Sequence, residues 1–372
     1  MTFCIITHVI HTEKDNQFFA YSPYVNEMNS WLKYVDEVIV VAPKENFEPN
    51  SIHSTYKDSS IKFIEIDKFN LLSFFSFLKA LFLIPKDCWL IFKAIQKADH
   101  IHIRCPGNIG LLACFVQILF PRKKKTVKYA GNWDAKSKQP ISYRIQKWIL
   151  RNEFLTKNMQ VLVYGDWENQ TKNIKSFFTA TYNDGEKTNV FPRELKNTIQ
   201  FIFVGALTKG KQPFYALQII EKLIKKGTNA SLFFYGEGIE KNNLQKYIAE
   251  NNLEKSISLK GNFDKDALKK VYQSSHFLIL PSKSEGWPKV IAEAMFWGCL
   301  PIATPVSCVP NMLDFGNRGV LLTENLAKDV CHLEQLINEK EVYNLKVISA
   351  LKWSRNYTID KFESEIIKLI QS

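Results

Sequence analysis

The sequence predicts an α/β protein made of two doubly wound domains. Short apolar segments, typical of buried parallel strands, alternate with helical patterns along the whole chain. Its 372 residues are enough for two full hydrophobic cores. A polar, turn-rich stretch at 183–188 separates two runs of this alternation. Two facing domains of this kind would form a cleft at the carboxyl ends of their strands, where such sheets bind ligands.

The first run of alternation predicts a domain over residues 1–193. Its expected strands are Phe3–Thr7, Glu37–Val41, Ile61–Ile66, His100–Ile103, Thr126–Tyr129 and Val161–Tyr164. Its expected helices are Pro23–Tyr34, Asn108–Leu119 and Ser142–Leu155. Neither this run nor the second contains the Gly-x-Gly-x-x-Gly fingerprint, which disfavours a nicotinamide-dinucleotide enzyme.

The second run predicts a domain over residues 194–352, followed by a tail at 353–372. The expected strands are Ile199–Val204, Ser231–Tyr235, Ser256–Leu259, Phe277–Leu280 and Leu300–Ala303. The expected helices are Phe214–Lys225, Ile239–Glu250, Asp266–Gln273, Val290–Phe296, Tyr343–Leu351 and Lys361–Ile370.

An apolar stretch from Leu71 to Ile84 is interrupted by Lys79 and ends at Pro85. It is shorter than the roughly 20 residues that a spanning helix needs. Two interpretations remain open: a buried helix, or an interfacial helix that dips into a bilayer surface. Residues 89–92 extend the apolar region, so the question concerns 71–92 as a whole.

Composition indicates an ordinary soluble globular protein, with 46% hydrophobic and 23% charged residues. The N-terminal residues lack a signal-peptide pattern, and the 7 cysteines have no paired spacing, which together favour a reducing, cytoplasmic setting. The net charge is +12, shared between the two halves of the chain. Its densest run is 122–125, followed by Lys128. This run is either a solvated loop or a contact for anionic lipid headgroups or an anionic acceptor.

The most informative segment runs from Pro281 to Met295. It follows an expected buried strand and predicts a tight loop and then a helix. Gly286 lets the backbone approach a ligand, and Pro288 suits the first helical turn. The start of such a helix offers free N–H groups to a phosphate or diphosphate. Glu285 lies just outside that pocket, and Glu293 lies about two turns into the helix on the same side.

The segment resembles the E-x7-E signature of glycosyltransferase family 4, whose members are retaining enzymes of the GT-B fold that use nucleotide sugars. The resemblance covers roughly residues 199–322, and more loosely the whole chain. It implies two Rossmann-like domains, an acceptor-binding one and a donor-binding one, with the C-terminal helix returning to the first. It also implies that Glu285 faces the donor sugar and that Glu293 binds the ribose hydroxyls.

The resemblance continues in the loop after the strand Ile199–Val204, which contains Gly205 and leads to Lys211. In the family, an Arg and a Lys of this loop grip the diphosphate. Lys211 stands at the Lys position, whereas Ala206 stands where the family has Arg. Three alternatives could make up for the missing Arg: Lys209 could replace it, a residue from the other domain could replace it, or Lys211 and the backbone could hold the phosphate alone.

Further donor-side candidates follow in family order. The implied donor site consists of Gly205, Lys209, Lys211, Gly236, Gly261, Asn262, Glu285, Gly286, Trp287, Pro288, Lys289, Val290 and Glu293, with Glu285 and Lys211 as catalytic residues. Asp264 and Asp266 fit an Asp-x-Asp metal motif. We reject that interpretation because Asp264 directly precedes a helical pattern, where Asp is a good N-cap. No metal and no other cofactor is expected.

Acceptor-side candidates follow strands of the first domain. They are His8, Arg104, Asn108, Asn132, Trp133 and Asp134. Trp133 would stack on a sugar or simply pack in the core; Arg104 would bind a phosphate or form a structural salt bridge. Family members commonly have a His after the strand ending at Tyr129, but this sequence has Asn132, Trp133 and Asp134 there. A His role is therefore not carried over.

The resulting hypothesis is a retaining glycosyltransferase that acts on a glycan acceptor, probed by Glu285→Ala and Glu293→Ala. The expected partners are a nucleotide sugar, a glycan or lipid-linked acceptor, and the anionic inner face of the cytoplasmic membrane, as in lipopolysaccharide or capsule synthesis. One alternative is an epimerase or other non-transferase chemistry, such as a phosphorylase, on the same fold. Another is a basic nucleic-acid-binding or lipid-binding protein, which the donor motifs disfavour; no nucleic acid is expected.

Overall fold

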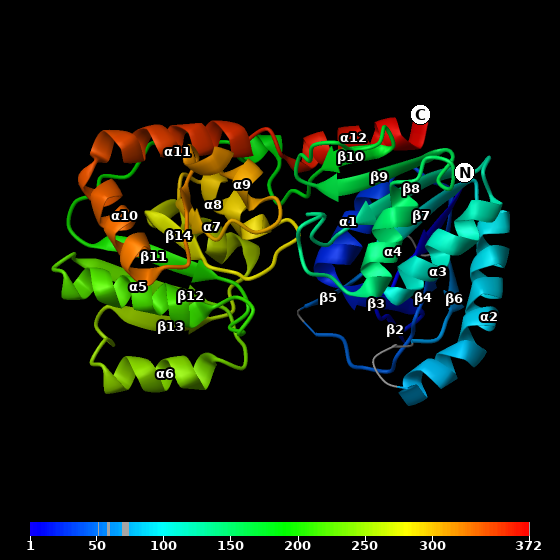
Figure 1. Ribbon diagram of the computed structural model, residues 1–372, viewed down its shortest axis with the longest axis horizontal. Coiled ribbons are helices and arrows are strands. Elements are labelled where there is room, and N and C mark those ends of the chain that lie inside the picture. Colours follow the sequence, from blue (N-terminus) through cyan, green and yellow to red (C-terminus); the bar gives the residue numbers. More distant parts are fainter. Residues whose placement is uncertain (51, 58–59, 69–73, 372) are drawn as a thin grey trace. The chain divides into compact units, whose positions relative to one another are not determined.

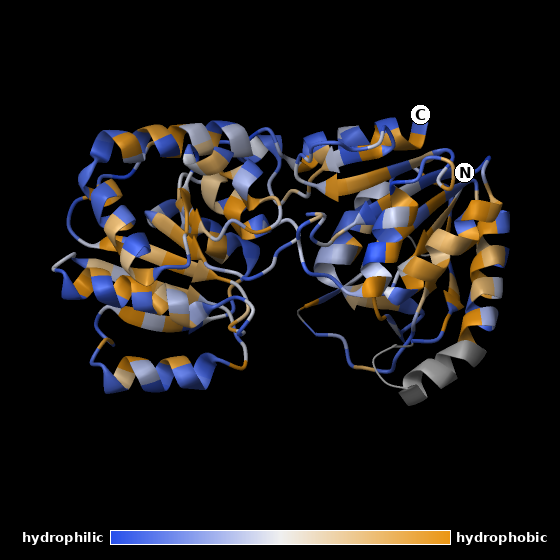
Figure 2. Cartoon of the chain, viewed as in Figure 1, coloured by the Kyte–Doolittle hydropathy of each residue, from blue (hydrophilic) through white to orange (hydrophobic). Residues whose placement is uncertain are grey.

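The computed structural model describes residues 1–50, 52–57, 60–68 and 74–371, apart from the side chains of residues 74–82. By its internal contacts the chain divides into two compact units, Met1–Phe177 with the tail from Phe362 onward, and Phe178–Lys361. Each unit contains a parallel sheet flanked by helices (Figure 1). The strands of both sheets are mainly apolar, whereas most helices carry polar residues on one side (Figure 2). The predicted α/β class with two doubly wound units is confirmed.

The first unit has a seven-stranded parallel sheet in the order β10-β9-β8-β7-β1-β4-β6. Its strands are β1 (Thr2–Ile6), β4 (Glu37–Ala42), β6 (Ile61–Glu65), β7 (His100–Cys105), β8 (Lys124–Tyr129), β9 (Met159–Tyr164) and β10 (Ile174–Phe177). All strands expected in this half are present. The sequence analysis missed β10 and a small antiparallel sheet of β2 (Thr12–Lys14), β3 (Gln17–Tyr21) and β5 (His53–Thr55). The turn between β2 and β3 has positive φ at Asp15 and Asn16, a recognisable hairpin signal.

Helices cover both faces of this sheet. The helices are α1 (Ser22–Leu32), α2 (Phe74–Lys97), α3 (Asn108–Val116), α4 (Ile141–Leu150) and α12 (Ile359–Gln371), with a 3-10 turn at Gln117–Leu119. On one face, α2, α3 and α4 pack on a core that includes Ile101 and Ile103. On the other face, Trp31 of α1 contacts the rings of His100 and His102. Of the apolar stretch at 71–92, residues 71–73 lie outside the described residues.

From Ile84 onward, one side of α2 packs against the core of the first unit, whereas Trp89 is 58% exposed. The helix continues through Pro85, where the sequence analysis ended the apolar stretch. Among the described residues, no helix has both the length and the apolar character needed to cross a membrane.

The second unit has a six-stranded parallel sheet in the order β13-β12-β11-β14-β15-β16. Its strands are β11 (Ile199–Val204), β12 (Ala230–Tyr235), β13 (Ile257–Gly261), β14 (Phe277–Leu280), β15 (Leu300–Ala303) and β16 (Val320–Leu321). Its helices are α5 (Pro213–Lys225), α6 (Lys241–Glu250), α7 (Lys265–Ser274), α8 (Lys289–Phe296), α9 (Val309–Met312), α10 (Leu326–Asn338) and α11 (Lys340–Ser354), with 3-10 turns at Asp184–Glu186 and Asp314–Gly316. The expected elements are present; β16, α9 and α10 were missed.

The boundaries of the compact units differ from those placed in the sequence at 193 and 353. The first sheet extends to Phe177, because β10 pairs in parallel with β9. Residues after it belong to the second unit: Arg193 donates to carbonyls at the ends of α7 and α8, including those of Gln273 and Gly298. The tail joins the first unit at Phe362, whose ring contacts Phe177. The helix that returns to the first domain is therefore α12.

Candidate donor site

An ion pair joins the loop after β11 to the loop after β14. Lys211 Nζ donates to Glu285 Oε1 at 2.5 Å, and the Glu285 side chain is only 9% exposed. The amide of Lys283 also donates to the carbonyl of Gly210 at 2.9 Å. The structure therefore brings together two residues that lie 74 positions apart and that the sequence analysis named as catalytic.

The loop that carries Glu285 leads directly into α8. Pro288 occupies the N-cap position, one residue earlier than the first-turn position expected, and no side chain caps the helix. Such a helix start leaves N–H groups available to an anion. Ser307 Oγ and Cys308 Sγ donate to the carbonyl of Gly286 at 3.2 and 3.1 Å, which holds the loop in place. Within the described residues, the buried hydroxyl of Ser282 in this loop has no hydrogen-bond partner.

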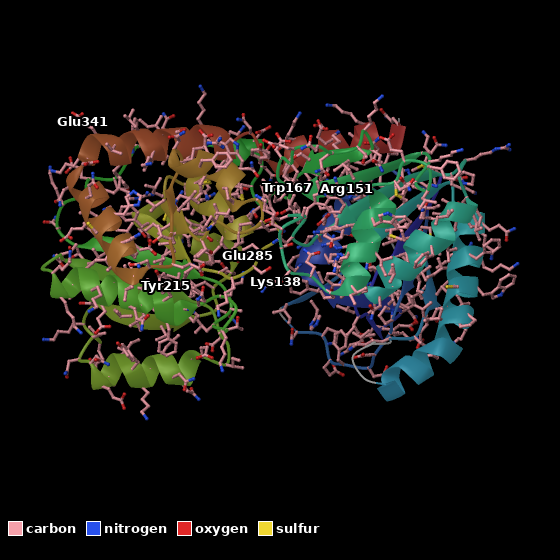
Figure 3. All side chains as sticks on the ribbon, in the orientation of Figure 1. Lys138, Arg151, Trp167, Tyr215, Glu285 and Glu341 are labelled. Carbon is pink, nitrogen blue, oxygen red and sulfur yellow. The ribbon has the colours of Figure 1, made fainter. Side chains whose placement is uncertain are left out.

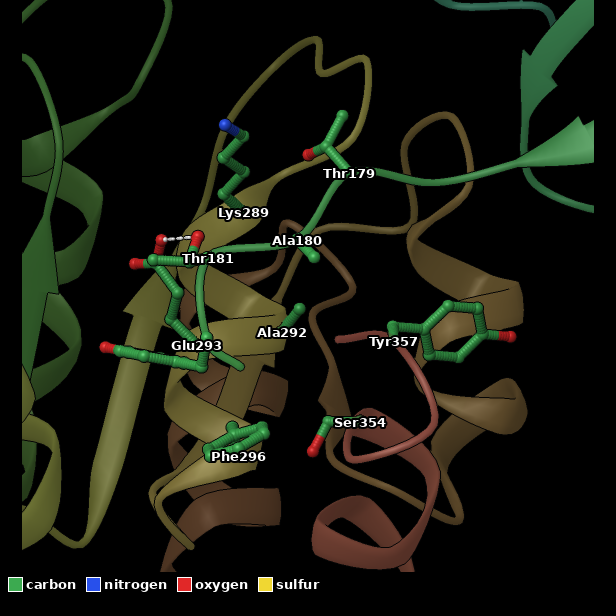
Figure 4. A pocket seen from close by; sticks show the side chains of 10 residues that line it. Thr179, Ala180, Thr181, Lys289, Ala292, Glu293, Phe296, Ser354 and Tyr357 are labelled. Atoms are coloured by element: carbon green, nitrogen blue, oxygen red, sulfur yellow. Dashed lines mark hydrogen bonds between the residues drawn. The ribbon is translucent and has the colours of Figure 1, made fainter. Parts of the chain in front are cut away.

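Glu293 lies further along α8, and its carboxylate is oriented by two hydroxyl groups. Thr181 Oγ1 donates to Oε1 at 2.6 Å, and Tyr272 Oη donates to Oε2 at 3.0 Å. Burial and the carboxylate of Glu293 raise the pKa of Tyr272 well above its usual value, so this hydroxyl stays protonated. Glu293 lines a small pocket together with Thr181, Lys289 and Tyr357 (Figure 4).

Glycines allow the loops after β11 and β12 to pack backbone against backbone. A Cβ on Gly236 would lie 1.9 Å from the carbonyl oxygen of Gly205, and one on Gly238 would lie 2.4 Å from that of Leu207. The amide of Gly236 also donates to the carbonyl of Gly261 at 2.9 Å. The glycines that the sequence analysis attributed to ligand proximity therefore have a structural role in this loop crossing.

The remaining donor candidates differ in their surroundings. Lys209 and Asn262 are exposed, whereas Lys289 and Val290 are half-buried at the start of α8. The ring of Trp287 contacts the rings of Trp353 and Tyr357. Trp287 therefore packs within an aromatic cluster of the second unit. The structure adds Thr181 and Tyr272, whose isolated hydroxyls gave no recognisable motif in the sequence.

In the first unit, Arg104 and Lys128 form a buried charge cluster with Glu27. A guanidinium nitrogen of Arg104 lies 3.2 Å from Glu27 Oε2 in an ion pair, and Lys128 Nζ lies 3.9 Å from Oε1. Lys128 is fully buried and lies 4.5 Å from the ring centres of both Tyr164 and Phe177. Arg104 thus forms the salt bridge of the structural alternative, and phosphate binding by this residue stays a prediction.

The loop after β8 has a similar outcome. Trp133 is buried, donates from Nε1 to Gln170 at 3.0 Å and contacts Tyr129 edge-on, so it packs as a core residue. Side-chain oxygens of Asn132 and Asp134 accept amide hydrogens within the loop. Of the other acceptor candidates, His8 is exposed after β1 and Asn108 begins α3, so both remain at the carboxyl edge of the sheet.

Several cations of the basic run at 122–125 and Lys128 are buried or bonded to backbone carbonyls. Lys125 is 2% exposed and donates to the carbonyl of Phe120 at 3.0 Å, and burial lowers its pKa to about 8. Lys123 donates to the carbonyls of Gln96 and Ala98. Lys125 and Lys128 are buried, so none of the open interpretations of this run (a solvated loop, a lipid contact or a contact with an anionic acceptor) describes these two residues. Within the described residues, no cluster of His, Cys, Asp or Glu side chains could hold a metal ion.

The whole chain resembles solved structures in fold. It matches a glycosyltransferase from Rickettsia africae with a TM-score of 0.69 at 15% identity, covering 100% of this chain and 97% of that one. It also matches HepE from Anabaena, solved with UDP and glucose, with a TM-score of 0.67 at 12% identity, covering 100% and 99%. These likenesses and the two doubly wound units define the class, a protein of the GT-B fold.

The sequence comparisons narrow this class. Residues 186–346 match the family model of glycosyl transferases group 1. The chain is 25% identical over 370 residues to protein CapJ of Staphylococcus aureus, covering 91% of this chain and 86% of CapJ. It is 28% identical to an uncharacterized glycosyltransferase of Haemophilus influenzae, covering 54% and 56%. It is 30% identical to the capsular polysaccharide biosynthesis glycosyltransferase CapH of Staphylococcus aureus, covering 34% and 36%. The matched part thus spans about half of the Haemophilus protein and about a third of CapH.

Proposed function

We propose that this protein is a retaining glycosyltransferase of family 4 that moves a sugar from a nucleoside-diphosphate sugar to a glycan hydroxyl. The Lys211–Glu285 pair, beside the uncapped start of α8, is the observation that carries the proposal. Glu293 follows on the same helix. Lys211 and the start of α8 suit the donor's diphosphate. Glu285, before the helix, suits the sugar, and Glu293, further along it, suits the ribose.

Each residue has a distinct role in this scheme. Lys211 and the first N–H groups of α8 hold the diphosphate, whose negative charge grows as the glycosidic bond breaks. When the diphosphate binds Lys211, Glu285 is released from its ion pair and accepts hydroxyls of the sugar. Glu293 binds the ribose while keeping Thr181 and Tyr272, because a carboxylate offers about four acceptor positions.

The proposed chemistry needs no protein base. The bond between the anomeric carbon and the diphosphate oxygen breaks, and the acceptor oxygen bonds to that carbon on the same face. The acceptor proton passes to the departing phosphate oxygen. No metal or other cofactor takes part, since Lys211 and the helix start supply the positive charge.

We further propose that the acceptor is a lipid-linked glycan of surface polysaccharide synthesis, capsule or lipopolysaccharide. The match to CapH supports the capsular assignment. The acceptor loops belong to the first unit, where His8 and Asn108 are the remaining candidates at the carboxyl edge. A lipid-linked acceptor places the enzyme at the inner face of the cytoplasmic membrane.

Thermal-shift screening against nucleoside diphosphates and their sugars tests the donor site. We expect one nucleotide to raise the melting temperature of the wild type and to raise it less in Glu293→Gln. Lys328→Ala on α10 is the exposed control and should respond like the wild type. Absence of stabilisation by any nucleotide would contradict the proposal.

Product analysis by NMR then tests the chemistry. A product with the donor's anomeric configuration supports retention, whereas an inverted product would refute it. Conversion of the sugar nucleotide to its epimer without any acceptor would identify an epimerase instead.

A further inference from the structure

The outer side of α4 in the first unit is apolar where a helix side facing water is normally polar. Ile141, Ile145 and Trp148 recur at helical spacing, and Ile141 and Trp148 are 73% and 63% exposed. The opposite side of the helix packs inward through buried Gln146, Ile149 and Leu150. The exposed apolar residues therefore take no part in the core of the unit.

Positive charge surrounds this apolar stripe. Arg144 lies on the same exposed side, and Arg151 caps the end of the helix, where Figure 3 labels it. The sequence from 135 to 152 contains five Lys and Arg residues and no Asp or Glu. Residues 86–157 contain 15 Lys and Arg against 4 Asp and Glu, an excess close to the +12 of the whole chain.

A groove runs beside the stripe. It has a volume of about 590 Å³, and its lining includes Arg144, Lys147, Trp148 and Arg151. The one carboxylate in its lining, Glu153, accepts the amide hydrogen of Lys172 at 2.7 Å. Phe154, next to it in sequence, is 76% exposed, and the ammonium group of Lys157 lies 5.1 Å from its ring.

We propose that the outer side of α4, with Phe154 and this groove, docks on an anionic lipid bilayer. We call this set, Ile141, Arg144, Ile145, Trp148, Arg151 and Phe154, the α4 surface. An apolar stripe flanked by cations, with Trp at its centre, has the chemistry of an interfacial helix, and the groove fits a phosphate headgroup. A helix side that faced only water would not normally expose this much contiguous apolar area, and the flanking cations complement an anionic lipid surface.

This surface would hold the enzyme at the inner face of the cytoplasmic membrane, and the inference rests on that location in the proposed function. The surface also suits a lipid-linked acceptor, because the loop after β8 leads directly into α4 at Ile141. Docking through α4 would bring the carboxyl edge of the first sheet close to the headgroups, where such an acceptor emerges.

Flotation of the full chain with vesicles tests the surface. The wild type should bind vesicles of phosphatidylcholine with phosphatidylglycerol at least about tenfold more tightly than phosphatidylcholine alone, since each cation near an anionic surface adds to binding. Joint replacement Ile141→Ser, Ile145→Ser and Trp148→Ser should weaken that binding at least about tenfold. Lys138, an exposed cation just before α4, and Arg144 supply charge beside the stripe. The double variant Lys138→Gln and Arg144→Gln should lose most of the preference for the anionic lipid.

The matched control lies on α11 of the second unit, where Val342, Leu345 and Ile348 are also exposed at helical spacing. Changing these three to Ser should leave vesicle binding within about twofold of the wild type, because α11 has fewer cations than the segment 135–152 and also carries Glu341. Circular dichroism and melting temperature confirm that each variant is folded.

Unchanged vesicle binding in the α4 triple variant, or equal binding to both lipid compositions, would overturn the inference. So would a dimer, measured by sedimentation, that the triple variant abolishes, because the surface would then bind a second copy of the chain. Nucleoside diphosphate binding, measured without vesicles, should be unaffected by the α4 changes. Its absence in the wild type would refute the transferase and leave vesicle docking to be judged separately.

Discussion

The two units use their charged residues in opposite ways. In the second unit, Lys211 and Glu285 pair at the edge of a loop, with the Lys211 side chain still 31% exposed. In the first unit, Arg104, Lys128 and Glu27 form a cluster whose side chains are only 13%, 0% and 6% exposed. An ion pair that keeps one partner near solvent can exchange it for a ligand, whereas a buried cluster cannot do so without a large penalty. The partly exposed pair therefore suits the ligand binding proposed for Lys211 and Glu285, whereas the buried cluster suits a structural role.

The largest effect that tests this difference between the two units is the loss of stability when the buried cluster loses Glu27. Glu27→Ala leaves Lys128 and Arg104 buried without their carboxylate, and we expect the free energy of unfolding to fall by about 3–5 kcal/mol. Urea denaturation measures the change. Glu37→Ala, whose partner Lys62 lies 4.0 Å away at the surface, is the control and should stay within about 0.5 kcal/mol of the wild type. If Glu27→Ala lowered the free energy of unfolding by less than about 0.5 kcal/mol, as expected for the control, water would have to reach the cluster.

The next effect is on turnover. Lys211→Ala removes the cation that faces the departing diphosphate, and we expect kcat to fall about 10²- to 10³-fold, the usual cost of losing one such group. Steady-state transfer assays measure it. Lys209→Ala serves as the matched change in the same loop, with an expected loss of less than about threefold, because this side chain is exposed and two residues away. Equal losses in both variants would mean that the loop binds phosphate without a dominant residue.

A smaller effect concerns nucleotide affinity. Thr181→Ala removes one of the two hydroxyls that orient Glu293, and nucleoside diphosphate affinity should fall roughly tenfold, as for a hydrogen bond to a charged group. Titration calorimetry measures it. Thr188→Ala, in the same connecting segment, is the control. An unchanged affinity would assign Thr181 a purely structural role.

The same contrast explains how far the sequence could be interpreted. The strands of both sheets were predictable because buried parallel strands are continuous apolar runs. Donor-side candidates could be selected from the sequence because Lys211, Glu285 and Glu293 occur in a fixed order around strands and helix starts, and the structure brings Lys211 and Glu285 together. In the first unit, single polar residues after strands carried no such pattern: Trp133 packs in the core and Arg104 pairs with Glu27.

Contacts between residues far apart in the sequence could not be predicted from the sequence alone. Thr181 and Tyr272 meet at Glu293 although no spacing rule links them. Arg193 was placed at a domain boundary because the surrounding residues are polar, yet it binds carbonyls at the ends of two helices. Charge patterning at coarse scale was also misleading: the excess is shared between the halves, but within the first half it is concentrated at 86–157.

The smallest expected effect separates helix capping from metal binding at Asp264. Its side chain accepts the amide hydrogen of Ala267 at 2.8 Å, which confirms the N-cap predicted for α7. Asp264→Ala should lower the free energy of unfolding by about 1 kcal/mol, and Asp264→Asn should lower it little because Asn caps almost as well. If the Asp-x-Asp pair held a metal, both variants would instead lose transfer activity, and added divalent cations would restore it in part. Tyr272, which orients Glu293, lies in the last turn of α7. If Asp264→Ala lowered stability but left nucleotide affinity unchanged, the N-cap would act on stability alone and not on the donor site.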